Sequence, residues 1–265
     1  VILHYLKSQP GLNVAATARG AGDEVSMIEL DVTDLPKLER LLKTQRPSHV
    51  VNAIGILING SKSNAANAIF LNSYFPHRLL EICTPLEAKV IHISTDCVFA
   101  GNDHGGYLDS SHPDAYDIYG RSKALGELLS GNSVTIRTSI IGPELPNSKG
   151  EGLFHWFMNS SGNQLNGYSN VYWSGLTTLE LAKVIYKVIR ANDAQGLYQV
   201  SNGGKISKLD LLRLFNELWS KNKEIETFEG IAKDKSLVPS KRDINFDIPP
   251  YKQMLVELKE YMDGS

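Results

Sequence analysis

Short apolar stretches rich in β-branched residues alternate with stretches of helical periodicity along the first half of this chain. The β-rich stretches are residues 13–18, 26–30, 49–54, 89–94 and 133–138. They are apolar at both odd and even positions, as strands are when helices cover both faces of a sheet. Strands that alternate with helices form parallel βαβ units with right-handed crossovers. The alternation therefore predicts an α/β fold with a doubly wound parallel sheet.

Stretches with helical periodicity lie between these strands and continue to the end of the chain. Asp34 is suited to cap one of them, whose leucines share one face. Pro76 predicts a kink inside another. The expected helices are residues 1–6, 34–42, 65–83, 119–129 and 178–190, one capped at Ser207, and one beginning near Pro249.

The character of the sequence changes after Gly142 and Pro143. Residues 144–173 are rich in Gly, Asn, Ser and aromatic side chains, which predicts a loop-rich segment, and a further strand is expected at 197–201. No low-complexity linker separates the two halves. We expect residues 1–142 to form the main α/β domain and residues 143–265 to form mainly a smaller α/β lobe, interleaved with the sheet.

Composition removes several classes of function. The formal net charge is −2 and no segment is strongly basic, which argues against nucleic-acid binding. The two cysteines, Cys83 and Cys97, have no metal-ligand spacing and the seven histidines are scattered, so no metal site is expected. This cysteine usage favours a reduced, cytoplasmic setting. No apolar run approaches the length of a membrane span, and no signal peptide is visible.

Three polar residues are candidates for chemistry. Tyr119 and Lys123 are four apart, which places them on one face of a helix. A neighbouring cation lowers the pKa of a phenol, which can then exchange a proton with a carbonyl or an alcohol. Thr95 follows a strand, at the end where parallel sheets bind ligands. The alternative is a surface helix on which Lys123 pairs with Glu127.

Four motifs in this order resemble the extended short-chain dehydrogenase/reductase family. They are V-V-N-A-I-G at 50–55, S-T-D-C-V-F-A-G at 94–101, Y-G-R-S-K-A-L-G-E at 119–127 and I-R-T-S-I-I-G-P at 136–143. Within that family the chain is most similar to the dTDP-4-dehydrorhamnose reductase group, which reduces the 4-keto group of nucleotide-linked deoxysugars. The resemblance covers most of the chain and is strongest at 48–143. It implies a Rossmann-like fold, a nucleotide-sugar substrate, a bacterial role in cell-surface polysaccharide synthesis, and pairing into a homodimer.

The resemblance also implies roles for individual residues. Tyr119 would give a proton to the keto oxygen, Lys123 would lower its pKa and hold the nicotinamide ribose, and Thr95 would bind the substrate oxygen. The residues implied to contact the cofactor, besides Tyr119 and Lys123, are Asp31, Val32, Ala53, Ile54, Gly55, Asn72 and Ile140. Those implied to contact the substrate, besides Thr95 and Tyr119, are Asp96, Cys97 and Trp173. Asn72 could equally be a polar residue inside a helix, and the cluster around Trp173 could equally be core.

Arg19 follows the strand at 13–18, where the family recognises the adenosine ribose. An acidic residue at this place favours NAD, whereas an arginine can bind a 2′-phosphate. The resemblance therefore favours NADP, with NAD as the alternative. Arg19 could also be an exposed loop charge without a partner.

The chain departs from the family in two respects. The Gly-rich loop that binds pyrophosphate is missing at the start, where the chain opens inside what should be the following helix, and we expect a truncation there. Cys97 and Ile140 stand where the rhamnose-pathway enzymes commonly carry Tyr and Trp. Both positions would face the sugar. The expected substrate is therefore a related 4-keto sugar, not necessarily that of the rhamnose enzyme.

Other functions of the same fold stay open at this point. A non-catalytic regulatory subunit, such as the beta subunit of methionine adenosyltransferase, would bind a cofactor and a protein partner without turnover. A nucleotide-sugar epimerase or dehydratase is a third alternative. A dehydratase would be expected to carry a Glu beside Asp96, and none is present.

Overall fold

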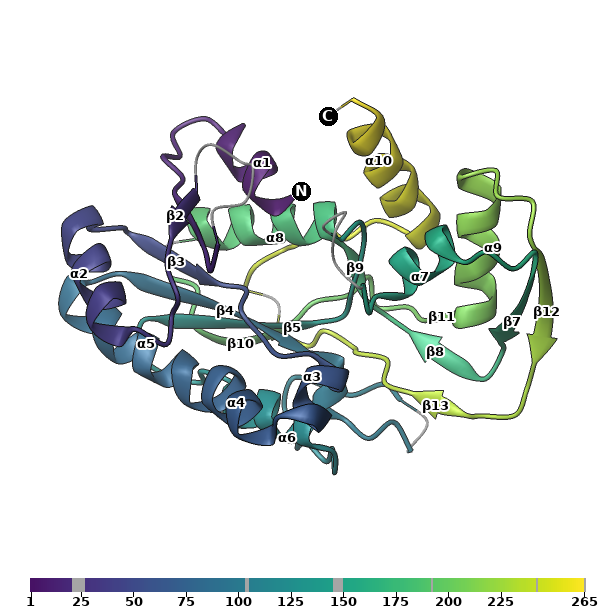
Figure 1. The fold of residues 1–265 in the computed structure, drawn as a ribbon, viewed down its shortest axis with the longest axis horizontal. Coiled ribbons are helices and arrows are strands. Elements are labelled where there is room, and N and C mark those ends of the chain that lie inside the picture. Colours follow the sequence, from purple (N-terminus) through teal and green to yellow (C-terminus); the bar gives the residue numbers. More distant parts are fainter. Residues whose placement is uncertain (21–26, 103–104, 145–149, 192, 242, 265) are drawn as a thin grey trace.

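The computed structural model describes residues 1–20, 27–102, 105–144, 150–191, 193–241 and 243–264. Its centre is a four-stranded parallel sheet with the strand order β10–β5–β4–β3 (Figure 1). The strands are β3 (His49–Asn52), β4 (Lys89–Thr95), β5 (Ser133–Thr138) and β10 (Gly196–Gln199). A separate parallel pair is formed by β1 (Ala16–Ala18) and β2 (Met27–Glu29). All six predicted strands are present but most are shorter than expected, and Ser26 lies outside the described residues.

Helices cover both faces of the four-stranded sheet (Figure 1). On one face α2 (Leu35–Gln45) and α5 (Phe75–Cys83) bury their apolar sides together with Val90 of β4. On the other, α1 (Ile2–Lys7) and α8 (Thr178–Arg190) pack on Ile91 and Ile136. A strand apolar on both faces is what this arrangement requires. The predicted α/β Rossmann-like class is confirmed.

Side-chain caps fix the starts of two predicted helices. The Asp34 carboxylate accepts a hydrogen bond from the Lys37 backbone N–H at 3.0 Å, where α2 begins. The Ser207 hydroxyl accepts one from the Asp210 N–H at 3.0 Å, at the start of α9 (Lys208–Leu218). Such caps satisfy N–H groups that the first helical turn leaves without partners. The last helix, α10 (Tyr251–Asp263), directly follows the predicted proline pair.

The segment at 65–83 is not one kinked helix. It divides into α4 (Ala65–Ile69), a π-helical turn η1 (Phe70–Tyr74) and α5. Pro76 has no N–H for the carbonyl of Asn72 one turn before it, which is consistent with the wider turn at this point. The neighbouring helix α6 (Ile118–Leu125) ends earlier than predicted, and a Cβ on Gly126 would lie 1.9 Å from the Asn72 carbonyl oxygen. The absent side chain therefore allows α6 to end directly against η1.

The second half of the chain contains more regular structure than expected. The stretch predicted to be loop-rich forms α7 (Leu153–Asn159), β7 (Gln164–Tyr168) and β8 (Val171–Trp173). Its buried aromatic side chains Phe154, Phe157 and Trp173 share a core with α9, and the rings of Phe154 and Phe215 lie edge to face at 5.2 Å. Distant partners complete the lobe, since β7 pairs with β12 (Glu224–Phe228), and β8 pairs with β11 (Ile206–Ser207) and β13 (Lys233–Asp234). These pairings are long-range, so local sequence does not reveal them.

The remaining elements are short. They are α3 (Ile58–Ser63), η2 (Thr84–Leu86), η3 (Asp96–Val98), β6 (Ile140–Ile141) and β9 (Leu176–Thr177). Strand β10 and helix α8 follow residue 142 yet belong to the main sheet and its cover. The division at residue 142 therefore stays a prediction. Among the described helices, none is both long and apolar enough to cross a bilayer.

Candidate active site

The three predicted catalytic residues meet where β4 ends. Thr95 is the last residue of β4, and Tyr119 and Lys123 lie on α6, which the Asp117 carboxylate caps through the Gly120 N–H at 3.0 Å. The hydroxyl of Thr95 is hydrogen bonded to the phenol of Tyr119. These contacts place a hydroxyl and a phenol side by side at the carboxyl edge of a parallel sheet, where ligands bind in such folds.

The environment of Tyr119 differs from the one expected. Burial raises the pKa of its phenol above the ordinary value, and the Cys97 thiol and the Asp96 carboxylate raise it further. The hydrogen bond with Thr95 lowers it, but Lys123 is not among the main influences on it. The predicted lowering of the Tyr119 pKa by Lys123 is therefore not seen, because desolvation outweighs the available stabilisation of a phenolate. The phenol is protonated at neutral pH.

Lys123 is a buried cation, with 4% of its surface exposed. Its ammonium donates a hydrogen bond of 2.7 Å to the backbone carbonyl of Ile93 in β4. Burial lowers the pKa of Lys123 to about 8, and the charge of Glu127 opposes that shift. The alternative that Lys123 pairs directly with Glu127 does not hold, because Glu127 binds Arg137 at 2.6 Å.

The turn η3 follows Thr95 and carries two of the residues expected to contact substrate. The Thr95 hydroxyl donates to the Asp96 carboxylate at 3.1 Å and accepts from the Cys97 N–H at 3.1 Å. Burial raises the pKa of Asp96, and the ammonium of Lys235 is the largest influence that lowers it. Burial raises the pKa of the Cys97 thiol to about 12. Cys97 is therefore a protonated thiol at neutral pH and no nucleophile.

Lys235 is a site residue that the sequence did not indicate. It is hydrogen bonded to the Cys97 thiol, and the charge of Asp96 raises the pKa of its ammonium against the effect of burial. Its stem packs on the backbone of Gly101, where a Cβ would lie 2.7 Å from the Lys235 Cγ. A cation from the C-terminal part of the chain thus reaches the turn η3. Only the tertiary fold brings these two segments together.

A cavity of about 380 Å³ opens in the small lobe. Its lining combines the rings of Trp156 and Tyr168 with the ammonium groups of Lys208 and Lys233. Lys208 also acts electrostatically on Asp96, lowering its pKa. Aromatic faces beside a pair of cations can hold a flat base next to phosphate groups.

The residues expected to line the cofactor lie where β3 ends. Ala53 and Gly55 are exposed and Ile54 is half-buried. A Cβ on Gly55 would lie 3.5 Å from the Asn72 Oδ1 and 3.9 Å from the Lys123 Nζ. This open backbone beside a buried ammonium fits a ribose or a nicotinamide, since nothing else covers it in the described part of the chain.

Asn72 is fully buried in η1, and its amide is used within the protein. The Oδ1 accepts from the Ile56 N–H at 2.8 Å, while the Nδ2 donates to the Ile56 carbonyl at 3.0 Å and to the Ser122 hydroxyl at 3.1 Å. These bonds clamp the loop that follows β3. They favour a positioning role over a proton relay, and direct contact with the cofactor stays a prediction.

Arg19 and Asp31 lie at the carboxyl ends of β1 and β2, and both are exposed. The Asp31 carboxylate accepts hydrogen bonds from Thr33 at 2.8 and 2.9 Å, which lower its pKa, and the charge of Arg19 lowers it further. Val32 beside them is buried in the core. Arg19 is thus an exposed cation, which a 2′-phosphate site needs, whereas the Asp31 carboxylate would repel a phosphate, and the role of Arg19 stays a prediction.

The two remaining candidates differ in exposure. Ile140 is 39% exposed beside the carboxyl edge of the sheet, whereas Trp173 is only 6% exposed. The Trp173 indole donates to the Ser139 hydroxyl at 2.9 Å, and its ring packs 5.7 Å from that of Tyr251. Trp173 therefore has the contacts of a core residue of the lobe, the alternative that its aromatic surroundings suggested. Its expected contact with substrate finds no support in this burial.

Residues 3–248 match the family described as the RmlD substrate binding domain. The chain belongs to this family. A dTDP-4-keto-6-deoxy-D-glucose reductase of Streptomyces niveus is 26% identical over 217 residues, which are 77% of this chain and 73% of that relative. A dTDP-4-dehydrorhamnose reductase of Mycobacterium tuberculosis is 33% identical over 122 residues, but the match covers 42% of this chain and 39% of that protein.

Solved structures show the same fold. The dTDP-4-dehydrorhamnose reductase of Bacillus anthracis, determined in complex with NADP, superposes with a TM-score of 0.76 and 18% identity, covering 91% of each chain. At this identity the likeness concerns the fold. Among the described residues of the present chain, no cluster of three or more His, Cys, Asp or Glu side chains could hold a metal ion.

Proposed function

We propose that this protein is an NAD(P)H-dependent reductase of the 4-keto group of a nucleotide-linked 4-keto-6-deoxyhexose. One observation carries the proposal, namely the hydrogen-bonded pair of Thr95 and Tyr119 beside Lys123 at the carboxyl edge of the sheet. The family supports it, since the relatives named above are reductases of dTDP-linked sugars. Synthesis of surface polysaccharide is the setting this substrate implies.

The residues divide the work of the reduction. A bound nicotinamide supplies the hydride for the carbonyl carbon. Tyr119 gives its proton to the carbonyl oxygen, and its raised pKa keeps that proton in place until the oxygen becomes basic. Thr95 orients the same oxygen and stabilises the phenolate that remains, as its effect on the Tyr119 pKa indicates. The Lys123 cation lies close enough to the exposed Gly55 backbone to bind the cofactor there.

NADP is the cofactor we propose, with NAD as the alternative. Arg19 supports this choice because its guanidinium is exposed at the strand end, where the adenosine ribose binds in such folds. The relative of the same fold from Bacillus anthracis binds NADP. Two free thiols, Cys83 and Cys97, are in keeping with the proposed cytoplasmic location.

The lobe cavity supports a nucleotide-linked substrate. With the sugar at Thr95 and Tyr119, the diphosphate would lie along Lys208 and Lys233, and the base beside Trp156 and Tyr168. Cys97 and Ile140 border the sugar and replace the larger Tyr and Trp of the rhamnose enzymes. The sugar itself is therefore proposed to differ from dTDP-4-dehydrorhamnose.

Replacing Lys208 with Met is expected to raise KM for the nucleotide sugar by about 10- to 100-fold, because a charge-assisted hydrogen bond is worth about 1.5–3 kcal/mol. The affinity for NADPH should stay unchanged. Lys252→Met is the matched control, since Lys252 is exposed and pairs with Glu217 on the surface. If steady-state kinetics gave the same KM for both variants, the proposal that the diphosphate binds in this cavity would be wrong.

We further propose that two copies pair through α4, η1 and α6. These elements pack together and expose the large apolar side chains of Ile69, Tyr74, Ile118 and Leu125, and the exposed Leu129 follows α6. Leu125 is 69% exposed. Leu125→Glu should therefore convert a dimer into a monomer in sedimentation experiments, while the far-UV circular dichroism spectrum stays that of the folded protein. A monomeric wild-type protein at micromolar concentration would contradict the pairing.

A further inference from the structure

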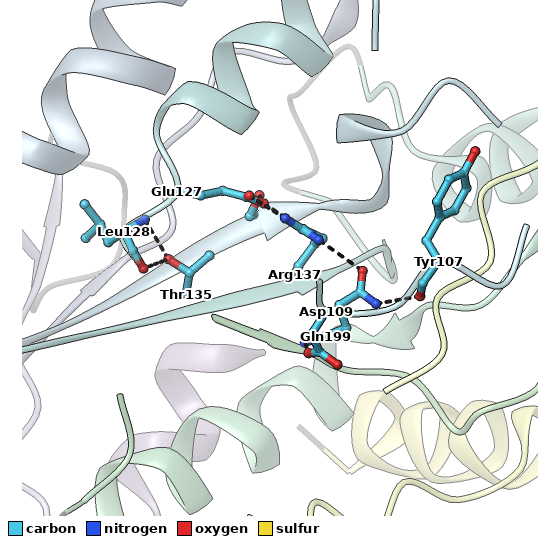
Figure 2. Close-up of polar contacts among 8 residues, drawn as sticks. Tyr107, Asp109, Glu127, Leu128, Thr135, Arg137 and Gln199 are labelled. Atoms are coloured by element: carbon cyan, nitrogen blue, oxygen red, sulfur yellow. Dashed lines mark hydrogen bonds and ion pairs between the residues drawn. The ribbon is translucent and has the colours of Figure 1, made fainter. Parts of the chain in front are cut away.

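A buried ion pair lies just behind the catalytic residues. Glu127, two residues after α6, and Arg137 of β5 are each 3% exposed. The guanidinium binds both carboxylate oxygens, with Nε to Oε1 at 2.8 Å and Nη2 to Oε2 at 2.6 Å (Figure 2). The Ser94 hydroxyl, next to Thr95, donates to the same carboxylate at 2.7 Å. The pair thus joins the end of α6 to both central strands.

Gln199 of β10 extends this network toward the lobe. It lies opposite Arg137 in the strand register, and its Oε1 accepts from the Arg137 Nη1 at 3.2 Å. Its Nε2 donates to the backbone carbonyl of Tyr107 at 2.6 Å and to that of Val238 at 3.5 Å (Figure 2 shows the first). One amide therefore faces the ion pair with its oxygen and two chain segments with its nitrogen.

Those two segments are bound to each other and to the site. The Tyr107 N–H donates to the Ser236 carbonyl at 3.0 Å, and the Val238 N–H donates to the Tyr107 carbonyl at 2.8 Å. Lys235, which is bound to the Cys97 thiol, directly precedes Ser236. We call the two bound segments, 105–109 and 236–241, the bridge. A shift of the bridge would therefore move the Lys235 ammonium relative to the turn η3.

Aromatic packing holds the same bridge from the side. The Arg137 guanidinium carbon lies 5.0 Å from the ring centre of Phe99, and that ring stacks on Tyr107 at 3.9 Å. Asp109 adds a second anchor, accepting from the Gln199 N–H at 2.6 Å and from the Ser240 N–H at 2.6 Å. The segments at 105–109 and 236–241 are thus fixed through β5 and β10.

Stability alone does not account for such a network. Burying an ion pair costs desolvation free energy, and apolar side chains of similar volume often serve a core equally well. What the charges add is a fixed geometry, because a two-pronged Arg–carboxylate pair has one favourable arrangement. We infer that Gln199, held by the Glu127–Arg137 pair, is a positioning residue that sets Lys235 against the turn η3 at Asp96 and Cys97.

Gln199→Glu tests this inference with almost no change of shape. The new carboxylate keeps an oxygen for Arg137, whose charge holds it ionised, but it turns an acceptor toward the carbonyls of Tyr107 and Val238. Amide hydrogen exchange should become at least 10-fold faster at 105–109 and 236–241. The consequence for catalysis rests on the proposed function: KM for dTDP-4-keto-6-deoxy-D-glucose should rise about 10-fold while kcat changes less than 3-fold.

Thr135→Val is the control, because it removes two buried hydrogen bonds of 2.9 Å to the Leu128 backbone from the same strand without touching the lobe (Figure 2). Gln199→Met, which removes the amide without adding charge, should speed exchange in the same two segments if Gln199→Glu folds poorly. If exchange became faster in the Gln199 variants but the wild-type protein showed no turnover, the positioning role of Gln199 would stand and the proposed reaction would be wrong. Unchanged exchange in both Gln199 variants, or the same pattern in Thr135→Val, would overturn the inference.

Discussion

Tyr119→Phe is expected to lower kcat by about 10²- to 10⁴-fold, the usual contribution of a positioned general acid. The substitution removes only the hydroxyl that carries the proton. Because the phenol is protonated at neutral pH in the wild-type protein, no change of charge accompanies the loss. Stopped-flow and steady-state measurements of NADPH oxidation would give the effect on the chemical step.

Two controls separate this effect from a loss of structure. The thermal midpoint and the affinity for NADPH should stay near their wild-type values, since the hydroxyl of Tyr119 contacts Thr95 and not the core. Tyr116→Phe changes a residue that is 70% exposed and three positions away. It should leave kcat unaltered. If the Tyr119→Phe variant were as active as the wild type, Tyr119 would not be the proton donor.

Lys123→Met is expected to abolish reduction and at the same time to stabilise the cofactor-free fold. The pKa of Lys123 falls from 10.5 to about 8 on folding, so holding this charged group in the folded protein at pH 7 costs about 3 kcal/mol. Met fills a similar volume without the charge. After the hydrogen bond to Ile93 is subtracted, the free energy of unfolding should rise by about 1–3 kcal/mol.

The stability of the wild-type protein should depend on pH in a direction that the lowered pKa of Lys123 determines. Below pH 8 the amine holds its proton in both states, and the folded wild type carries the full penalty. Between about pH 8 and 10.5 the unfolded chain holds more protons than the folded one, so the stability of the wild type rises with pH. Urea unfolding of the Lys123→Met variant should lack this rise. A variant less stable than wild type at pH 7, or an unchanged slope, would contradict the account of Lys123.

Much of the main domain could be predicted because its signals are local. A run such as 133–138 is rich in β-branched residues, and the helix at 178–190 has the bounds that its periodicity predicts. Tyr119 and Lys123 follow from helical spacing, and Thr95 from its place after a strand. Capping by Asp34 and Ser207 is likewise a property of four consecutive residues.

The rest depends on contacts between distant segments. Strands β7 and β12 pair across about sixty residues, and the local sequence around Gln164 does not predict that Glu224 is its partner. Lys235 reaches Cys97 only through the fold, and the raised pKa of Tyr119 follows from burial that a helical spacing cannot reveal. The π-helical turn before Pro76 is a third case, since a proline predicts a break but not its geometry.

The most direct test of the central claim is reduction itself. Full-length protein would be mixed with NADPH, or with NADH, and with a set of dTDP- and UDP-linked 4-keto-6-deoxyhexoses, and products would be identified by mass. The account predicts that one NADPH is oxidised for each sugar that gains two hydrogens, with NADPH preferred over NADH. Cofactor binding without turnover of any 4-keto sugar would contradict the reductase and favour a non-catalytic, partner-binding subunit of the same fold.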